Sequence, residues 1–471
     1  MEKAKTLEEE VPDSPAPGQL QAVILWQQGD QTAAIEQIQA LTDRFPDQPA
    51  IKLNLARMHR ALGETDQALS VLQPALKAHP EHTGLKVEAA RAYANNNDGE
   101  KVRTLLQDAL AADPKAVDAR AYLARFHLLQ GRPDQAVEIA EAAPDDQATS
   151  NPALLEVIGK AQHRQGNREN ALETFDKLIA VKPDHPAGYI EAGQILLGMD
   201  RPGEAASRLE KGRETAGSSQ ELQFLLARAL LQSGQGERAH AFIEKLEAEY
   251  PENANVAILR GNHALSYAAD EDAAIAAFKR AMKLEPSETR LMDVVRLQTQ
   301  LGRRQAAIAR LESWRDDHDT SLGLDAALAE LYMVDDNYDA AAAIYGQLVE
   351  RAPDTATFHN NFAWALAQRG KHEEALTHAR KAADLAPDNP GIQDTLGTVL
   401  LKRGEVSAAI EVLAKAAETA PDRPDIQLNY ADALVEAGKR DKAVKLVESL
   451  QTKQLTQRMS ERVERIRGQL K

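Results

Sequence analysis

Positively charged residues recur at a nearly constant interval in the first half of the chain. The step from Arg57 to Arg91 equals the step from Arg91 to Arg125, Lys160 follows after almost the same interval, and Arg228 stands two further intervals along. Guanidinium and ammonium groups bind carboxylates, and they donate hydrogen bonds to the carbonyl oxygens of a peptide. If the interval is that of a structural repeat, these cations lie in a row and form one binding surface.

The sequence contains no set of residues with the spacing of a familiar catalytic or metal site. It has no GxxxxGK[ST] loop, no GxGxxG after a predicted strand and no HExxH motif. His79 and His82 lie in a predicted turn, His372 and His378 lie on different sides of a predicted helix, and neither pair has a third ligand nearby. There is no cysteine, which excludes disulfides and thiolate chemistry. We therefore predict that the chain is not an enzyme and holds no metal or cofactor.

Composition points to a folded protein whose partners are other proteins. Of the 471 residues, 43% are hydrophobic and 27% are charged, which is typical of a globular chain. The net charge of −16 argues against nucleic acid as a partner, because binding phosphates needs a basic surface. No apolar run approaches the roughly 18 residues that would cross a bilayer, so we expect no direct membrane insertion.

Regularly spaced prolines indicate the elements that must position the cations. Most successive steps match the interval between the arginines or twice that interval. The series is Pro46, Pro80, Pro114, Pro183, Pro251, Pro286, Pro353, Pro387 and Pro421. A period of about 34 residues is the length of one helix-turn-helix unit in a solenoid.

Residues 390–421 illustrate one such unit. Gly404 supplies the left-handed conformation that commonly ends a helix, and Pro421 prevents the second helix from continuing. Small residues where the two helices face each other allow close approach. The residues on the facing sides are Leu396, Gly397, Leu400, Ala409, Leu413 and Ala416.

This pattern resembles the tetratricopeptide repeat (TPR) family. It recurs in phase along the chain, for example at Leu55, Ala56, Gly63, Ala68, Leu72, Ala75 and Pro80. The resemblance implies an all-α, right-handed superhelical solenoid of about thirteen units. We assign residues 1–16 to a polar flexible leader, 17–450 to the TPR array and 451–471 to an amphipathic capping helix.

In TPR proteins the first helix of each unit lines a concave groove that binds partner segments. If the first helices of this chain line such a groove in the same way, the cationic row lies in the groove, with Arg60 and Arg164 beside it. The predicted partner-binding residues are Asn54, Arg57, Arg91, Asn95, Arg125, Lys160, His163, Arg228, Asn360, Asn361 and Trp364. The cationic residues of the early repeat units suit an acidic segment of a partner protein. Alternatively, the arginines cover neighbouring apolar surface, and Trp364 is a core residue packed between units.

The corresponding groove positions of the later repeat units are neutral to acidic in charge. Further residues at these positions are Asp394, Thr398, Asn429 and Asp432. A partner with the opposite charge gradient would then bind in one direction. In the capping segment, Leu455, Met459, Val463, Ile466 and Leu470 form one helix face. Arg458, Arg462, Arg465 and Arg467 form the other. We expect this helix to cover the last apolar surface of the array; the alternative is contact with an acidic partner.

A narrower resemblance concerns residues 311–421, with the motif NNxAW…APDNPxxxDTLG. It is similar to bacterial TPR proteins of exosortase and exopolysaccharide export systems. This implies a scaffold or adaptor in a bacterial envelope or export assembly. The location would be the periplasm or envelope for a fragment of an exported precursor, and the cytoplasm otherwise. Two alternatives stay open, a self-associating structural array and a regulatory module of a larger protein.

Overall fold

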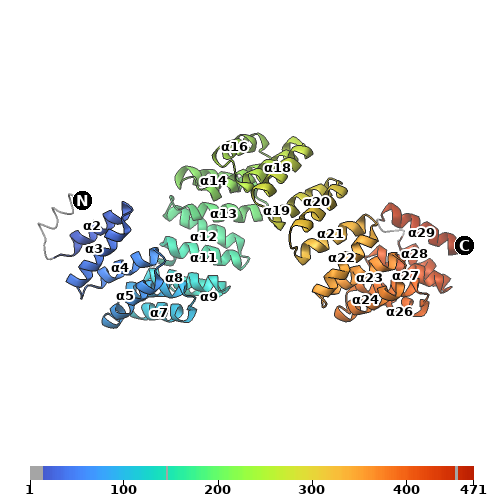
Figure 1. Cartoon of the computed structure of the whole chain (residues 1–471), viewed down its shortest axis with the longest axis horizontal. Helices are drawn as coiled ribbons and strands as arrows, with labels where there is room; N and C mark the ends of the chain where they lie inside the picture. Colours follow the sequence, from blue (N-terminus) through green and yellow to red (C-terminus); the bar gives the residue numbers. More distant parts are fainter. Residues whose placement is uncertain (1–13, 145–146, 451–454, 471) are drawn as a thin grey trace. The chain divides into compact units, whose positions relative to one another are not determined.

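The chain folds into α-helical hairpins. A computed structural model describes residues 14–144, 147–450 and 455–470. Within these ranges the regular elements are the helices α2 to α29 and one π-helical turn, η1, and there is no strand (Figure 1). The prediction of an all-α solenoid is confirmed.

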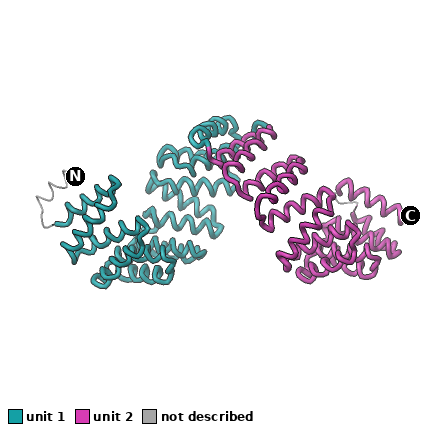
Figure 2. The backbone as a smooth tube through the Cα atoms, viewed as in Figure 1, with its two compact units in different colours: residues 1–251, 266–268 teal, residues 252–265, 269–471 magenta. Residues whose placement is uncertain are grey.

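The helices fall into two compact units, which we describe separately (Figure 2). Unit 1 comprises residues 1–251 with 266–268, and unit 2 comprises residues 252–265 and 269–471. In both, helices pack against their neighbours along the chain, as expected for a repeat protein, although α9 packs against α11 rather than against the short α10 between them.

The described part of unit 1 contains seven helical hairpins and one short additional helix, α10. In chain order its helices are α2 (Ala16–Gln27), α3 (Gln31–Arg44), α4 (Pro49–Ala61), α5 (Thr65–Ala78), α6 (Thr83–Asn95), α7 (Gly99–Ala112), α8 (Val117–Leu129), α9 (Pro133–Glu141), α10 (Gln147–Ser150), α11 (Pro152–Arg164), α12 (Arg168–Val181), α13 (Pro186–Gly198), α14 (Pro202–Thr215), α15 (Gln220–Gln232) and α16 (Gly236–Glu249).

The described part of unit 2 contains six hairpins and a final single helix. Its elements are α17 (Ala254–His263), continued by η1 (Ala264–Ala268), of which residues 266–268 are counted with unit 1, then α18 (Glu271–Leu284), α19 (Glu288–Gln300), α20 (Arg304–Asp317), α21 (Leu322–Val334), α22 (Tyr338–Arg351), α23 (Ala356–Gln368), α24 (His372–Leu385), α25 (Pro390–Lys402), α26 (Val406–Thr419), α27 (Pro424–Glu436), α28 (Arg440–Leu450) and α29 (Gln457–Leu470).

The hairpin of α25 and α26 shows why the sequence repeats as it does. The Asn389 side chain accepts hydrogen bonds from the backbone amides of Gly391 and Ile392 and so caps the start of α25. Gly404, with a φ of 82°, follows the end of that helix in the left-handed region. A Cβ atom on Gly397 would lie 2.8 Å from Leu413 Cδ2 and still closer to Cγ, so the helices are closer than alanine permits.

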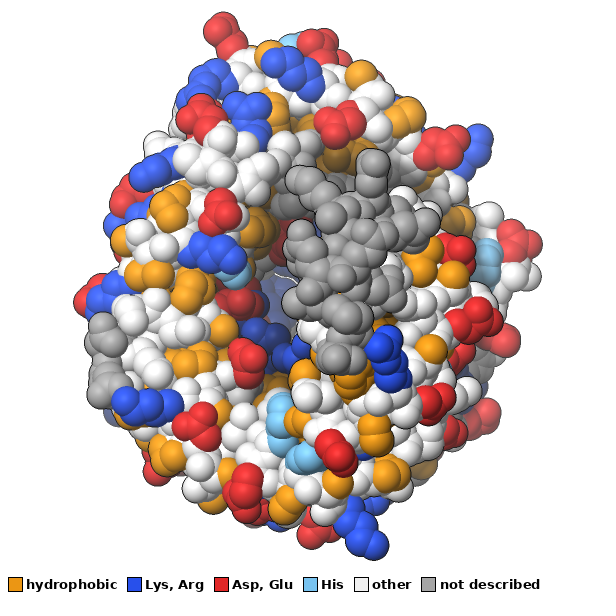
Figure 3. All heavy atoms as spheres, turned by 90° about the vertical axis from the view of Figure 1, so that its left-hand side faces the viewer, with side chains coloured by type: hydrophobic (Ala, Val, Ile, Leu, Met, Phe, Trp, Pro, Cys, Tyr) orange, Lys and Arg blue, Asp and Glu red, His pale blue; other side chains and the backbone are white. Residues whose placement is uncertain are grey.

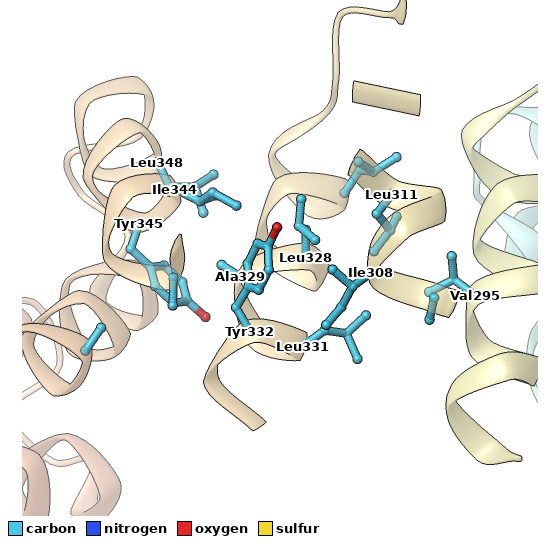
Figure 4. Close-up of a cluster of buried hydrophobic side chains, with 14 of the residues drawn as sticks. Val295, Ile308, Leu311, Leu328, Ala329, Leu331, Tyr332, Ile344, Tyr345 and Leu348 are labelled. Carbon is cyan, nitrogen blue, oxygen red and sulfur yellow. The ribbon is translucent and has the colours of Figure 1, made fainter. Parts of the chain in front are cut away.

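Clusters of buried apolar side chains join neighbouring hairpins within each unit. One cluster in unit 2 runs from α19 through α20 and α21 to α22, and Figure 4 shows its side chains directed toward one another. Tyr332 and Tyr345 bring hydroxyl groups into this cluster. The Tyr332 hydroxyl donates to Glu312, and the Tyr345 hydroxyl accepts from Asn361 Nδ2 at 3.0 Å. Burial is the main reason that the pKa of each tyrosine is raised to about 12.

Candidate partner-binding surfaces

The predicted early binding residues lie on first helices that touch one another across successive hairpins. In unit 1 these contacts run in order through α4, α6, α8, α11, α13 and α15. Asn54 and Arg57 belong to α4, Arg91 and Asn95 to α6, Arg125 to α8, Lys160 and His163 to α11, and Arg228 to α15. The repeat therefore carries these residues on equivalent helices, as the sequence analysis expected.

Three arginines of this surface converge on one buried carboxylate. Glu88, on α6, is 1% exposed. Arg60 Nε donates to Glu88 Oε1, while Arg57 Nε lies 3.6 Å and Arg91 Nη1 lies 3.7 Å from Glu88 Oε2. The Arg57 and Arg91 side chains remain 49% and 39% exposed. We call these four residues the Glu88 cluster; it carries more positive than negative charge and presents guanidinium donors to solvent.

Lys160 is neutralised more completely than the arginines. Its ammonium group lies 2.6 Å from Glu156 Oε1 and 3.3 Å from Glu191 Oε1. Burial opposes ionisation of Glu156, but the hydrogen bond and charge of Lys160, with smaller contributions from Arg125 and His185, lower the pKa of that carboxyl. The cationic row is thus interleaved with carboxylates. In Figure 3, Lys, Arg, Asp and Glu side chains are likewise intermixed over the visible face.

The other early residues are less closely connected. Asn54 and Arg57 line a cavity of about 290 Å³ whose other lining residues include Trp26 and Met58. Asn95 Nδ2 lies 3.5 Å from Thr65 Oγ1, and His163, Arg125 and Arg228 are exposed. Arg164, expected beside the row, donates to the backbone oxygen of Leu128. The structure thus brings Arg57 and Arg91 together through Glu88, and it leaves Arg228 apart from them.

The predicted late residues line two adjoining cavities in unit 2. The first, which we call the Trp364 pocket, has a volume of about 620 Å³; the second has about 580 Å³. Four residues line both: Trp364, Asn429, Arg458 and Arg462. They come from α23, α27 and α29, and contacts join α23 to α25, α25 to α27 and α27 to α29. The groove residues predicted in the later repeat units therefore lie on one connected surface.

Two asparagines and one aromatic ring form the α23 wall of the Trp364 pocket. Asn360 Nδ2 donates to Asn361 Oδ1 at 3.1 Å, and Asn361 Nδ2 donates to the Tyr345 hydroxyl. Asn360 Oδ1 is buried and accepts no hydrogen bond from the described residues. Trp364 is partly exposed, and Lys402 Nζ lies 5.9 Å from its ring centroid. Trp364 therefore lines the cavities and is not a fully buried core residue.

Asp394, on α25, lines the same pocket and is held by an amide instead of a cation. Both of its carboxylate oxygens accept from Asn429 Nδ2, each at 2.8 Å. Burial is the main reason that the pKa of Asp394 is raised to about 6, although Asn429, Arg462 and Arg423 oppose the shift. A carboxyl group with a strongly raised pKa that lines a cavity is a candidate functional group.

Helix α29 contributes a basic side to both cavities. Val463 and Ile466 are buried against the end of the array, as the amphipathic pattern predicted. Arg462 Nε donates to Asp432 Oδ2 at 2.9 Å, and Arg462 Nη2 donates to Asn429 Oδ1 at 2.6 Å. Arg465 lies 3.4 Å from Asp432. The acidic contact considered for this helix is thus made within the chain, and residues 451–454 of the predicted segment lie outside the described residues.

Other titratable groups in the described part of the chain do not assemble into a metal site. Within it, no group of three or more His, Asp or Glu side chains could hold a metal ion. One histidine pair does exist: His359 Nδ1 lies 2.9 Å from His378 Nδ1. Burial, followed by the charge of His359, lowers the pKa of His378. None of the described helices is long and apolar enough to cross a bilayer.

Comparison with known families identifies the repeat. Models described as tetratricopeptide repeat match residues 59–113, 100–161, 196–262, 366–422 and 400–459, with further matches at 20–83, 326–390 and 153–185. Together they cover well over half of the chain. The chain belongs to the tetratricopeptide repeat family. Because TPR arrays bind other proteins, membership supports a protein-protein interaction scaffold.

Individual relatives of this TPR chain are distant. Anaphase-promoting complex subunit 7 of Dictyostelium discoideum is 25% identical over 217 residues, which are 44% of this chain and 36% of that protein. This TPR chain thus spans about a third of that relative's length.

Solved structures are also only distantly similar. The APC/C hetero-tetramer Cut9-Hcn1 matches at 15% identity, with a TM-score of 0.43 over 98% of this chain and 92% of that one. The type IV pilus biogenesis factor PilW matches at 18% identity, with a TM-score of 0.40 over 44% and 96%. At such identities and scores, neither likeness indicates a partner or a location for this TPR chain.

Sequence reasoning missed the acidic and aromatic residues that complete these surfaces. Glu88 stands in the run LKVEAARAY, where a carboxylate among apolar residues and three positions before Arg91 is the signal that could have revealed it. Trp26 precedes the first predicted turn and was not among the predicted groove residues. Lys402 and Asp425 follow only from knowing how neighbouring TPR helices are rotated.

Proposed function

We propose that this chain is a non-catalytic scaffold that holds a segment of a partner protein along its first helices. The observation that carries the proposal is the Glu88 cluster, in which three guanidinium groups share one carboxylate. Arg57 and Arg91 keep unused donors at the surface, because each approaches Glu88 through a single nitrogen. A partner carboxylate bound there would gain charge-assisted hydrogen bonds worth about 1.5–3 kcal/mol each.

The surroundings of the Glu88 cluster support a segment that carries both an apolar and an acidic side chain. The cavity beside Arg57 is lined mainly by apolar groups, among them Val23, Trp26 and Met58. Arg91 also lies over the Tyr122 ring, 5.7 Å from its centroid, which holds the guanidinium in place. Apolar burial would supply affinity, and the cations would set the register of the bound segment.

A photo-crosslinking experiment tests the proposal. A photoreactive amino acid at Asn54 or Asn95, on the first helices, is expected to trap a partner in lysate of the source organism. The same group at Arg103, an exposed residue of the second helix α7, serves as the control position. Mass spectrometry then identifies the trapped peptide.

The variant Arg57→Gln/Arg91→Gln/Arg125→Gln should lose the crosslink while its circular dichroism stays helical. Glutamine is preferable to glutamate, because reversed charges beside Glu88 would also unfold the hairpin. Crosslinking that is equal at Asn54 and Arg103, or unchanged in the triple variant, would refute binding along the first helices.

We further propose that this scaffold works in a bacterial envelope or export assembly. It rests on the resemblance of residues 311–421 to TPR proteins of those systems. Fractionation of source cells, with detection of the native protein, is the direct test. Recovery with envelope fractions supports the proposal, and recovery only with soluble cytoplasmic proteins contradicts it.

A second candidate function, self-association, is favoured by the surface of α2. This helix has no charged residue, and Leu20 and Val23 are 41% and 45% exposed. Two copies meeting through α2 would avoid the repulsion expected between chains with a net charge of −16. Sedimentation should then show a dimer that Leu20→Glu/Val23→Glu dissociates; a monomer at every concentration excludes it.

A further inference from the structure

Among the described residues, Asp394 in the Trp364 pocket is a carboxylate with no cation at ion-pair distance, in contrast with the other inner carboxylates. Glu88, Glu156 and Asp432 each have an arginine or lysine within that distance. The polar partner of Asp394 is Asn429, a neutral amide. The Asp394 oxygens therefore retain accepting capacity in a cavity of about 620 Å³.

A second hydrogen-bond acceptor lines the same pocket. Asn360 Oδ1 is buried and receives no donor from the described residues, although the Nδ2 group of that side chain is bonded to Asn361. A buried acceptor without a donor is costly, and a ligand that donates to it removes that cost. Two acceptors with unused capacity in one cavity indicate a ligand rich in N–H groups.

The aromatic wall also suits a cation. Trp364 lines both cavities, whereas Lys402, whose ammonium lies over its ring, lines only the second. Trp364 thus contributes aromatic surface to a cavity that Lys402 does not line, and such surface suits a flat or cationic group. Guanidinium stacks on tryptophan more favourably than ammonium does, because it is planar and weakly hydrated.

The chain contains an internal precedent for this recognition. The guanidinium of Arg462 binds a carboxylate and an amide oxygen together, those of Asp432 and Asn429. The Trp364 pocket is lined by residues that carry the same pair of groups, the carboxylate of Asp394 and the amide oxygen of Asn360. We propose that the Trp364 pocket binds the arginine side chain of an extended partner segment, an inference that rests on the proposed scaffold function.

The remaining charged groups around the pocket define how selective it can be. Arg423 is paired with Asp425, and Arg462 is paired with Asp432, so neither presents a free charge to the ligand. Arg458 is exposed on α29 and lines the pocket. It opposes a cationic ligand, and its removal should strengthen binding. The pocket therefore accepts one arginine side chain rather than a polybasic stretch.

A pair of matched probes tests the proposal. One is a short capped peptide of glycine and serine with a central arginine; in the other, the neutral isostere citrulline replaces arginine. Fluorescence of Trp364, in the full chain with Trp26→Phe and Trp314→Phe, reports binding. We expect the arginine peptide to bind at least about tenfold more tightly, because each tenfold step needs only one good charge-assisted hydrogen bond.

Asp394→Asn keeps the shape of the side chain and should abolish the preference for arginine. Asp388→Asn removes the same charge from a residue whose side chain is 96% exposed, and it should leave the preference intact. Arg458→Gln should tighten binding of the arginine peptide by about twofold to fivefold, as expected for one partly screened charge. Equal binding of the two peptides, or a preference that survives Asp394→Asn, would overturn the proposal.

The two proposals fail in distinguishable ways. If a partner is trapped at Asn54 but arginine is not preferred over citrulline, the scaffold function stands and the pocket assignment is wrong. If arginine is preferred and depends on Asp394, but no partner is trapped at the first helices, the pocket stands and the groove proposal in unit 1 is refuted.

Discussion

Asn429 Nδ2 lies 2.8 Å from each carboxylate oxygen of Asp394, so a neutral amide is the direct partner of a partly buried acid. A single amide nitrogen shared between two oxygens stabilises the carboxylate less than an arginine would. The arrangement is consequently a poor one for stability and a suitable one for a group that awaits a ligand.

Asp394→Asn should stabilise the folded chain at neutral pH. Because the folded pKa is about 6 and the unfolded value is 3.8, the folded state binds the proton more tightly between these pH values. The free energy of unfolding therefore decreases as pH rises from 4 to 6, by up to about 3 kcal/mol. Asparagine removes this dependence. Urea unfolding at pH 7.5 should show the gain and at pH 4 should show little, while Asp388→Asn shows neither; an Asp394→Asn variant that is less stable at pH 7.5 contradicts the raised pKa.

Glu88→Gln should destabilise unit 1, since it leaves Arg57, Arg60 and Arg91 without their shared carboxylate. Removing one partner of a buried ion pair typically costs about 3–5 kcal/mol, and the half-exposed arginines place the expected loss near the lower figure. Hydrogen exchange should show the loss in the hairpins around α4 and α6. Glu81→Gln, on an exposed turn residue, is the control. The prediction is wrong if both variants exchange at the same rate.

The positions of the repeats could be predicted from the sequence more completely than the side-chain contacts on the candidate binding surfaces. Gly397 and Leu413, and the proline series, follow from backbone geometry that every unit must satisfy, so their spacing predicts the hairpins. The partners of Arg57 and Arg462 depend on how one helix is rotated against another. Glu88 and Asp432 each lie nearly one whole repeat away from those arginines along the chain, and no local pattern joins residues so far apart.

Gly397→Ala should destabilise the hairpin of α25 and α26 although alanine favours helices. The new Cβ would lie 2.8 Å from Leu413 Cδ2 and still closer to Cγ, nearer than any ordinary contact, so the fully buried Leu413 side chain or the helices must shift. Overpacking of this kind costs about 1–3 kcal/mol. Gly203→Ala is the matched control, because nothing lies within 4 Å of its Cβ position, and it should be neutral or slightly stabilising. Thermal unfolding that shifts equally in both variants would show that the close approach is unimportant.

Arg462→Met should test whether α29 is held by its charges or by its apolar face. Methionine keeps the length of the side chain but removes the donors to Asp432 and Asn429, so the more distant Arg465 is left as the described cation nearest Asp432. We expect a loss of about 1–3 kcal/mol in the local stability of α29, and added salt should reduce the difference between the two proteins. Val463→Ala, which empties a buried position on the same helix, should cost a similar amount but should not depend on salt. Hydrogen exchange of α29 at low and high salt separates the two contributions: if Arg462→Met is as insensitive to salt as Val463→Ala, the Asp432 pair contributes nothing to holding the helix.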